Sequence, residues 1–80
     1  MTTAEIHEKL TGVFRDVFDD PKLTLGETTT AKDVEGWDSL AHVSLIVAVE
    51  KAFRVRFTTK EVQALANVGD FVRLIERRLG

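Results

Sequence analysis

The sequence contains no cysteine, which excludes disulfide bonds, thiolate metal ligands and a cysteine nucleophile. Its two histidines, His7 and His42, are far apart and form no metal-ligand pair, so no metal site is expected. The longest apolar run, residues 45–49, is far shorter than the roughly 20 residues that cross a bilayer. Residues 1–5 lack the basic and apolar stretches of a signal peptide. We therefore expect a cytoplasmic protein that does not bind membranes.

Length and composition predict one small folded domain over residues 1–80. Apolar residues make up 44% of the chain and charged residues 30%, which is typical of globular rather than disordered proteins. So short a chain buries only about 60% of its unfolded surface, which leaves little room for an enclosed catalytic pocket. We expect a monomer that is not an enzyme. The net charge of -2 argues against nucleic acid as the main partner.

Hydrophobic periodicity predicts an all-α fold, a small four-helix bundle with three longer helices and one short helix. The first helix begins at a capping box, Thr2 with Glu5, and is stopped by Asp-Asp-Pro at residues 19–21. The second spans residues 39–53, the short third spans residues 59–65, and Asn67 caps the last.

A long ordered loop joins the first two helices, and it shows no helical periodicity. We expect its apolar side chains to hold it on the core: Leu23, Leu25, Val34 and Trp37. The second helix has too many apolar residues for one face. Its core stripe is expected to be Leu45, Ile46, Val49 and Phe53. Leu40, Val43 and Val47 then face solvent or a partner, unless the helix is central and packed on several sides.

The loop enters the second helix through Gly36-Trp37-Asp38-Ser39-Leu40. On local physics alone, Asp38 and Ser39 are a helix-capping pair with no chemistry. Asp38, Ser39 and His42 also suggest a hydrolase, but the Gly-x-Ser-x-Gly elbow and an oxyanion loop are missing, so no catalytic residue is expected. We expect His42 near the bundle interior or beside Ser39, and His7 on a solvated helix face.

Asp38-Ser39-Leu40 resembles the attachment motif of the acyl carrier protein family, the phosphopantetheine-binding carriers. The chain length, the loop position, the second helix, the short third helix and the turn at residues 67–71 also fit that family. The resemblance implies that Ser39 carries a covalent 4'-phosphopantetheine arm from coenzyme A, flanked by Asp38 and Leu40. It further implies a discrete acyl carrier protein, which tethers acyl intermediates as thioesters and presents them to partner enzymes.

The implied partners are a phosphopantetheinyl transferase, to which Asp38 also matters, and acyl-loading and acyl-processing enzymes. The expected contact surface comprises Trp37, Ala41, Val43, Ser44, Val47 and Lys51, although Trp37 is equally well explained by packing within the loop. Ala41 and Ser44 stand where the family commonly has carboxylates, and the second helix holds one acid, Glu50. A specialised fatty-acid, lipid or polyketide pathway is therefore expected, with an aminoacyl or peptidyl carrier as the alternative.

A small helical regulatory or nucleic-acid-binding module is the rival of a different class. It would use the basic residues of the second half of the chain: Arg54, Arg56, Lys60, Arg73, Arg77 and Arg78. No recognition-helix pattern accompanies these residues, and a solvated face explains them as well.

Overall fold

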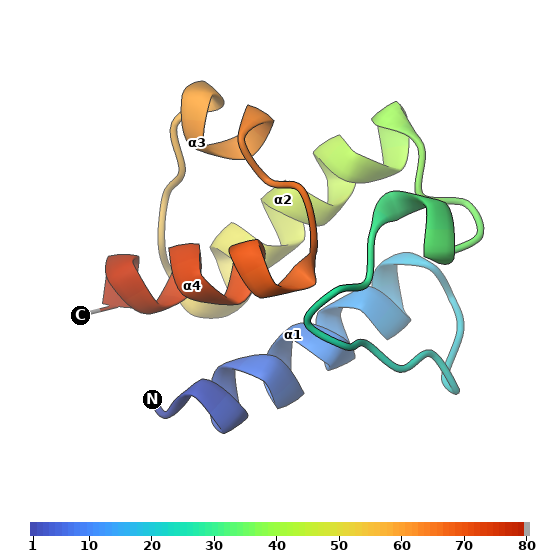
Figure 1. The fold of residues 1–80 in the computed structure, drawn as a ribbon, viewed down its shortest axis with the longest axis horizontal. Helices are drawn as coiled ribbons and strands as arrows, with labels where there is room; N and C mark the ends of the chain where they lie inside the picture. The colour runs from blue at the N-terminus through green and yellow to red at the C-terminus, as the bar shows by residue number, and fades with distance from the viewer. Residues whose placement is uncertain (80) are drawn as a thin grey trace.

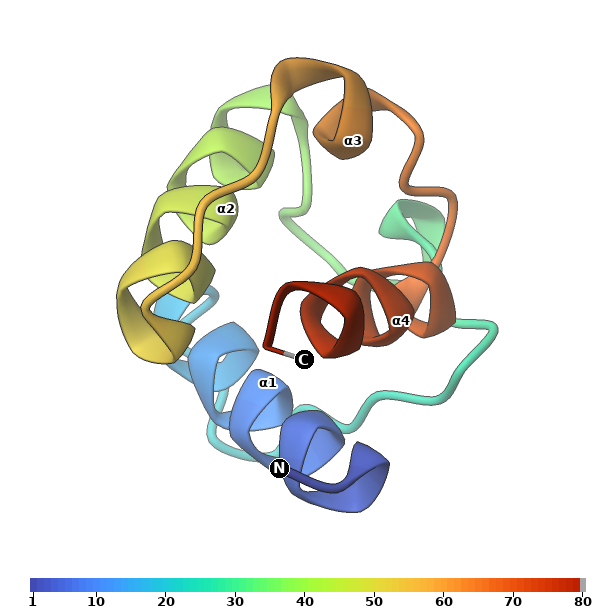
Figure 2. The same cartoon turned by 90° about the vertical axis from the view of Figure 1, so that its left-hand side faces the viewer.

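The computed structural model describes residues 1–79 and consists of helices and loops (Figure 1). The helices are α1 (Thr3–Val17), α2 (Ser39–Phe53), α3 (Thr59–Gln63) and α4 (Val68–Leu79), with a short 3₁₀ turn, η1 (Ala31–Asp33), in the long loop. Figure 2 shows α4 with α1 below it, α2 to its left and α3 above it. The predicted all-α bundle of three longer helices and one short helix is confirmed.

Capping boxes start α1 and α3, as their sequences predict. The Thr2 hydroxyl accepts from the Glu5 N–H at 3.1 Å, while the Thr2 N–H donates to the Glu5 carboxylate at 2.8 Å. Thr58 and Glu61 repeat this exchange at 3.1 and 2.9 Å. Each box satisfies two backbone donors that would otherwise lack a partner at the helix start.

The first helix ends at a left-handed residue, before the chain reaches the proline. Asp19 has φ 51°, and the Asp20 N–H donates to the Arg15 carbonyl at 3.0 Å. This is the Schellman arrangement, which satisfies carbonyls that the helix itself leaves unpaired. Pro21 follows an end already formed, so its ring is not what stops the helix.

The core draws apolar side chains from α1, α2, α4 and the long loop. The predicted stripe of α2 is buried in full: Leu45, Ile46, Val49 and Phe53. Leu40, Val43 and Val47 are 81%, 63% and 44% exposed. The two-faced interpretation of α2 is therefore correct, and the alternative of a helix packed on several sides is wrong.

Side chains of α1 hold the long loop against the bundle. The four apolar loop residues pack inward as expected, Leu25 and Val34 fully buried and Leu23 and Trp37 partly so. The His7 ring donates from Nε2 to the Leu25 carbonyl at 2.7 Å, since a carbonyl can only accept. Arg15 donates from Nε to the Leu23 carbonyl at 2.8 Å. The expectation of a solvated His7 is wrong, because this residue is half-buried and ties the loop down.

The same loop contacts the start of α4. The Val68 N–H donates to the Thr29 carbonyl and the Gly69 N–H to the Glu27 carbonyl, both at 2.8 Å. The N–H groups in the first turn of a helix have no carbonyl partners within that helix, and here the loop provides them for α4. Asn67 caps the same turn as predicted, accepting from the Asp70 N–H at 2.8 Å.

Two helices differ in detail from the sequence-based prediction. The third helix ends at Gln63, before the predicted residue 65. Leu79, expected in the apolar stripe of α4, is 40% exposed, whereas Leu74 is buried. Within residues 1–79, no helix combines the length and the apolar character needed to cross a membrane.

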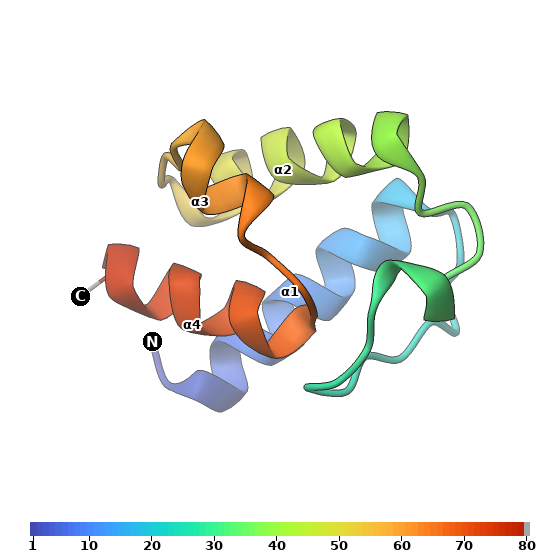
Figure 3. The same ribbon diagram turned by 45° about the horizontal axis from the view of Figure 1, so that its top comes forward.

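The start of α1 and the end of α4 lie at one end of the molecule, and α2 begins at the other end (Figures 1 and 3). The longest dimension is 31 Å. The loop-to-helix junction around Ser39 is therefore well separated from the start of α1 and the end of α4.

Candidate functional site

A tight turn delivers the chain into α2. Gly36 has φ 86°, a conformation that side chains disfavour, and the Asp38 N–H donates to the Gly36 carbonyl at 3.0 Å. Asp38 then adopts an extended backbone, and its carboxylate accepts from the Ala41 N–H at 2.8 Å. Asp38 is thus the N-cap of α2, and Ser39 is its first helical residue.

Ser39 and Leu40 are exposed at this helix start. The first turn of a helix holds backbone N–H groups without intrahelical partners, together with the positive end of the helix dipole. An anion attached to the Ser39 hydroxyl would therefore be stabilised by its surroundings. The side chain also stands clear of the preceding loop, where another protein can reach it.

Ser39 lines a groove of about 650 Å³. Trp37, Asp38 and His42 line it beside Ser39, and the opposite wall comes from the end of α3, the connection that follows it and α4: Gln63, Leu65, Ala66, Asn67 and Phe71. The lining mixes apolar side chains with amide and imidazole groups. Such a groove suits a slender chain of methylene and amide groups that extends from Ser39 toward the connection between α3 and α4.

Trp37 joins the site to the core. Its ring meets Phe14 edge to face, with centroids 5.1 Å apart and planes at 84°, and Phe18 lies 6.2 Å away. Its Nε1–H donates to Nδ1 of His42 at 3.1 Å. This packing supports the interpretation of Trp37 as a loop anchor, and its contact with partners stays a prediction. His42 is half-buried and lies beside the groove.

The polar groups at the junction are not arranged as in a hydrolase. In a Ser–His–Asp relay, the acid accepts from the histidine Nδ1–H and so orients the ring. Here Nδ1 of His42 is itself an acceptor, because an indole N–H can only donate, and the Asp38 carboxylate is engaged by Ala41. Among residues 1–79, no cluster of three or more potential ligands could hold a metal ion.

The outer face of α2 carries almost no charge. Leu40, Val43, Ser44, Val47 and Lys51 are exposed, and Ala41 is half-buried among them. The one acid of the helix, Glu50, is half-buried and accepts from the Phe57 N–H at 2.9 Å. The predicted contact residues of α2 therefore share one surface, which is apolar or neutral except for Lys51.

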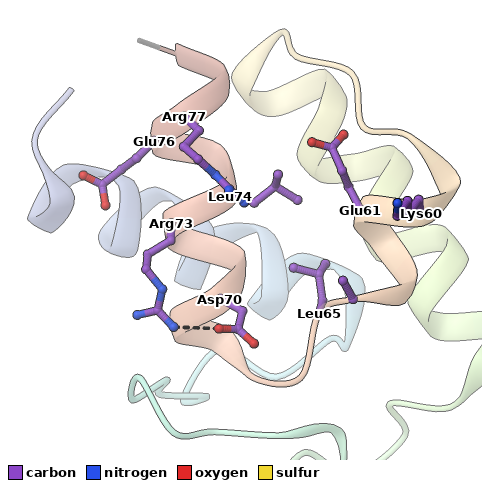
Figure 4. Close-up of a pocket in the computed structure, with 9 residues that line it drawn as sticks. Lys60, Glu61, Leu65, Asp70, Arg73, Leu74, Glu76 and Arg77 are labelled. Carbon is purple, nitrogen blue, oxygen red and sulfur yellow. Dashed lines mark hydrogen bonds and ion pairs between the residues drawn. The ribbon is translucent and has the colours of Figure 1, made fainter.

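A second hollow, of about 690 Å³, lies between α3 and α4 (Figure 4). Its rim holds three bases and three acids: Lys60, Arg73, Arg77, Glu61, Asp70 and Glu76. Arg73 pairs with Asp70 at 2.6 Å, and the guanidinium, followed by the Ala66 N–H, lowers the pKa of that carboxyl. Arg78 pairs with Glu61 in the same way. Two of the bases proposed for nucleic-acid binding, Arg73 and Arg78, are thus paired with acids within the protein, which weakens that alternative.

Two features of the site could not be expected from the sequence. The far wall of the groove comes from the end of α3 and the start of α4, and no spacing pattern connects those residues with Ser39. The Trp37–His42 hydrogen bond spans a loop-to-helix junction, so no helical periodicity indicates it. Asn67 was expected, but only as a helix cap.

Comparison with known proteins gives one family. Residues 8–75 match the family model described as a phosphopantetheine attachment site. The chain is 32% identical to an acyl carrier protein of Thermosynechococcus vestitus over 80 residues, which cover 99% of this chain and 98% of the relative. It is also 32% identical, over 62 residues, to a putative mitochondrial acyl carrier protein of Schizosaccharomyces pombe, covering 78% of this chain and 54% of that one.

A solved structure agrees with these relatives. The solution NMR structure of holo acyl carrier protein from Geobacter metallireducens superposes with a TM-score of 0.85 at 43% sequence identity. The match covers 90% of this chain and 83% of that one.

Proposed function

Because the chain belongs to the acyl carrier protein family, whose members hold 4'-phosphopantetheine covalently and are carriers rather than enzymes, we propose that Ser39 is its attachment residue. The observation that carries this proposal is the position of Ser39. It is the exposed first residue of α2, within the matched region and in the lining of a groove. We also propose that residues 1–80 act as one carrier domain.

The residues around Ser39 fit the attached group. The N–H groups of the first turn of α2 that lack intrahelical partners would stabilise its phosphate, Asp38 caps that turn, and Leu40 would flank the group. The groove would accept the pantetheine chain beyond the phosphate. When bound, the group supplies a terminal thiol that carries acyl groups as thioesters. The chain has no cysteine, so this thiol is the only one present.

Attachment is a phosphoryl transfer to Ser39. The Ser39 Oγ forms a bond to the phosphorus that bears pantetheine, and the pyrophosphate bond of coenzyme A breaks. The adenosine bisphosphate half leaves, and the hydroxyl proton passes to a base of the transferase. The chain contributes the oxygen and its exposure, and the transferase supplies the catalysis.

Acyl carrier proteins interact with a phosphopantetheinyl transferase and with acyl-processing enzymes, and we propose the outer face of α2 as the surface that both use. Its apolar strip adjoins Ser39 and has no other occupant in residues 1–79. Because Ala41 and Ser44 replace the carboxylates common in the family, we propose a specialised fatty-acid, lipid or polyketide pathway. Nucleic acid and membranes are not among the proposed partners.

We propose the cytoplasm as the compartment. A mitochondrial location is the alternative, because the S. pombe relative is named as a mitochondrial protein. Fractionation of native cells distinguishes the two, and intact-mass measurement of the recovered protein weighs the arm together with its cargo. An aminoacyl rather than an acyl mass would assign the chain to the alternative class of carriers.

The central experiment incubates the purified protein with coenzyme A, magnesium and a broad-specificity phosphopantetheinyl transferase. We expect a mass increase of one arm and new reactivity with a thiol-directed dye. Ser39→Ala should gain neither, and Ser44→Ala, which removes another exposed serine of α2, should gain both. Ser39→Ala should keep its melting temperature, because Asp38 still caps the helix. Modification of Ser39→Ala, or none of the wild type, contradicts the proposal.

A further inference from the structure

The two aromatic side chains beside Ser39 are joined by a hydrogen bond. The rings of Trp37 and His42 lie 19° from parallel, with centroids 6.0 Å apart, and the Trp37 Nε1–H reaches Nδ1 of His42 at 3.1 Å. The two ring planes are thus nearly parallel, and the hydrogen bond joins the ring nitrogens. Phe14 holds the Trp37 ring from the core side, so the donor has a set position.

This hydrogen bond determines where His42 carries its proton. An indole N–H can only donate, so Nδ1 of His42 must present a lone pair. A neutral imidazole with a bare Nδ1 carries its hydrogen on Nε2. His42 is thus a hydrogen-bond donor at its other edge, away from Trp37.

His42 lies three residues after the attachment residue on α2, and both residues line the same groove. On a helix, residues three positions apart are neighbours, and a side chain leans over the turn that precedes it. His42 therefore leans toward Ser39 and lines the same groove. The Asp38 carboxylate accepts from the Ala41 N–H through Oδ1, and within residues 1–79 no hydrogen bond joins it to His42.

We propose that His42, held as the Nε2–H tautomer by Trp37, is a positioning residue that donates a hydrogen bond to the phosphodiester on Ser39. The inference rests on the proposed attachment at Ser39. It adds a side-chain donor to the backbone N–H groups of the α2 start, and it gives Trp37 a role in the loaded protein beyond packing. Through this contact, the Trp37–His42 pair would fix the phosphodiester on Ser39 beside the groove.

NMR of the imidazole nitrogens in the apo protein tests the first step. We expect His42 to show a protonated Nε2 and a bare Nδ1. Trp37→Phe keeps an aromatic ring against Phe14 but removes the donor, so His42 should become a mixture of tautomers. A protonated Nδ1 in the wild type, or an unchanged pattern in Trp37→Phe, overturns the inference.

The second step compares apo and holo protein, with loading verified by mass. Exchange of the His42 Nε2 hydrogen with water should slow by about tenfold or more on loading, because hydrogen bonds to charged groups are among the stronger ones in proteins. His7 is the internal control: its Nε2 hydrogen is donated to the Leu25 carbonyl, so its exchange should not change. Equal exchange at His42 in both forms overturns the inference.

The phosphorus resonance of holo variants provides an independent measurement. It should move in His42→Ala, which removes the donor, and stay near the wild-type position in His42→Gln, whose amide retains one. An unchanged resonance in His42→Ala overturns the proposed contact alone. A protein that gains no mass overturns the Ser39 assignment and this inference with it, so the two failures are distinguishable.

Discussion

At Gly69 the first turn of α4 approaches the long loop so closely that a side chain has no space. A Cβ built there would lie 2.9 Å from the Glu27 carbonyl oxygen, which already accepts from the Gly69 N–H. This oxygen belongs to the backbone, and the neighbouring hydrogen bond from the Val68 N–H to the Thr29 carbonyl holds the loop in place. It therefore cannot move aside as the end of a flexible side chain could. The contact joins the loop that leads to Ser39 with the helix that lines the far wall of the groove.

Gly69→Ala should therefore lower the free energy of unfolding by about 1–3 kcal/mol, the range seen when a packed contact is overfilled. Gly12→Ala is the matched control, because a Cβ at that position in α1 meets nothing within 4 Å. Alanine favours the helix over glycine by about 1 kcal/mol, so this variant should be more stable than the wild type. Urea denaturation measures both, and two variants of equal stability would show that the loop yields.

Single residues also show what a sequence can and cannot indicate. The caps Asp38 and Asn67 were predictable, because a cap depends only on its own side chain and the next few N–H groups. The bond from His7 to the Leu25 carbonyl was not, since it depends on how the loop folds back over α1. The same holds for Trp37 and His42, whose meeting requires the turn at Gly36.

Among the helices, α2 has two faces that differ clearly in their surroundings. One face supplies four buried side chains to the core, and the other presents an apolar strip beside Ser39. Exposed apolar patches on small proteins commonly mark interaction sites, and salt does not weaken apolar burial. Charge complementarity mainly accelerates encounter and is screened within about 8 Å at physiological salt.

We expect Val47→Asp to lower the kcat/KM of loading by a phosphopantetheinyl transferase by about tenfold, as loss of an interface anchor does. Lys51→Ala, at a neighbouring exposed position of α2, should change it by less than about twofold, since an exposed charge contributes little. For the wild type, the rate should vary little between low and moderate salt. Strong salt dependence, together with a larger effect at Lys51 than at Val47, would instead indicate recognition by charge.

The bounds of the elements were predictable where local and packing signals agree. Both ends of α2 match the prediction, because a strong cap starts it and Phe53, its last residue, completes the buried stripe. α3 is shorter than predicted, since Leu65 packs on the core from the connection that follows the helix. Leu74 is buried although the predicted apolar stripe of α4 omitted it. Its burial depends on the elements that surround α4, which the sequence of α4 alone does not indicate (Figure 2).

For the molecule as a whole, three surface carboxylates link stability to pH. The Thr2 N–H lowers the pKa of Glu5, the Thr58 N–H and then Arg78 lower that of Glu61, and Arg73 lowers that of Asp70. A pKa that is lower in the folded state stabilises the protein above the ordinary value, 4.5 for Glu and 3.8 for Asp. That contribution is lost as the pH falls through the lower folded-state pKa.

The free energy of unfolding should therefore decline from about pH 5 downward. The double variant Glu5→Gln, Glu61→Gln keeps acceptor oxygens at both capping boxes but removes two titrating groups, so its decline should be shallower. Denaturant titrations at a series of acidic pH values measure both slopes. Parallel curves for the wild type and the double variant would assign the acid sensitivity to other carboxylates.

The start of α1 and the end of α4 both lie away from the start of α2, so the protein is easy to immobilise (Figure 1). An affinity tag or a surface linker joined near either of these helix ends emerges on the side of the molecule away from Ser39. A sensor chip or bead coated through such a tag presents every copy with the start of α2 pointing outward. Enzymes captured from solution would then meet the arm in a uniform orientation, whichever end is anchored.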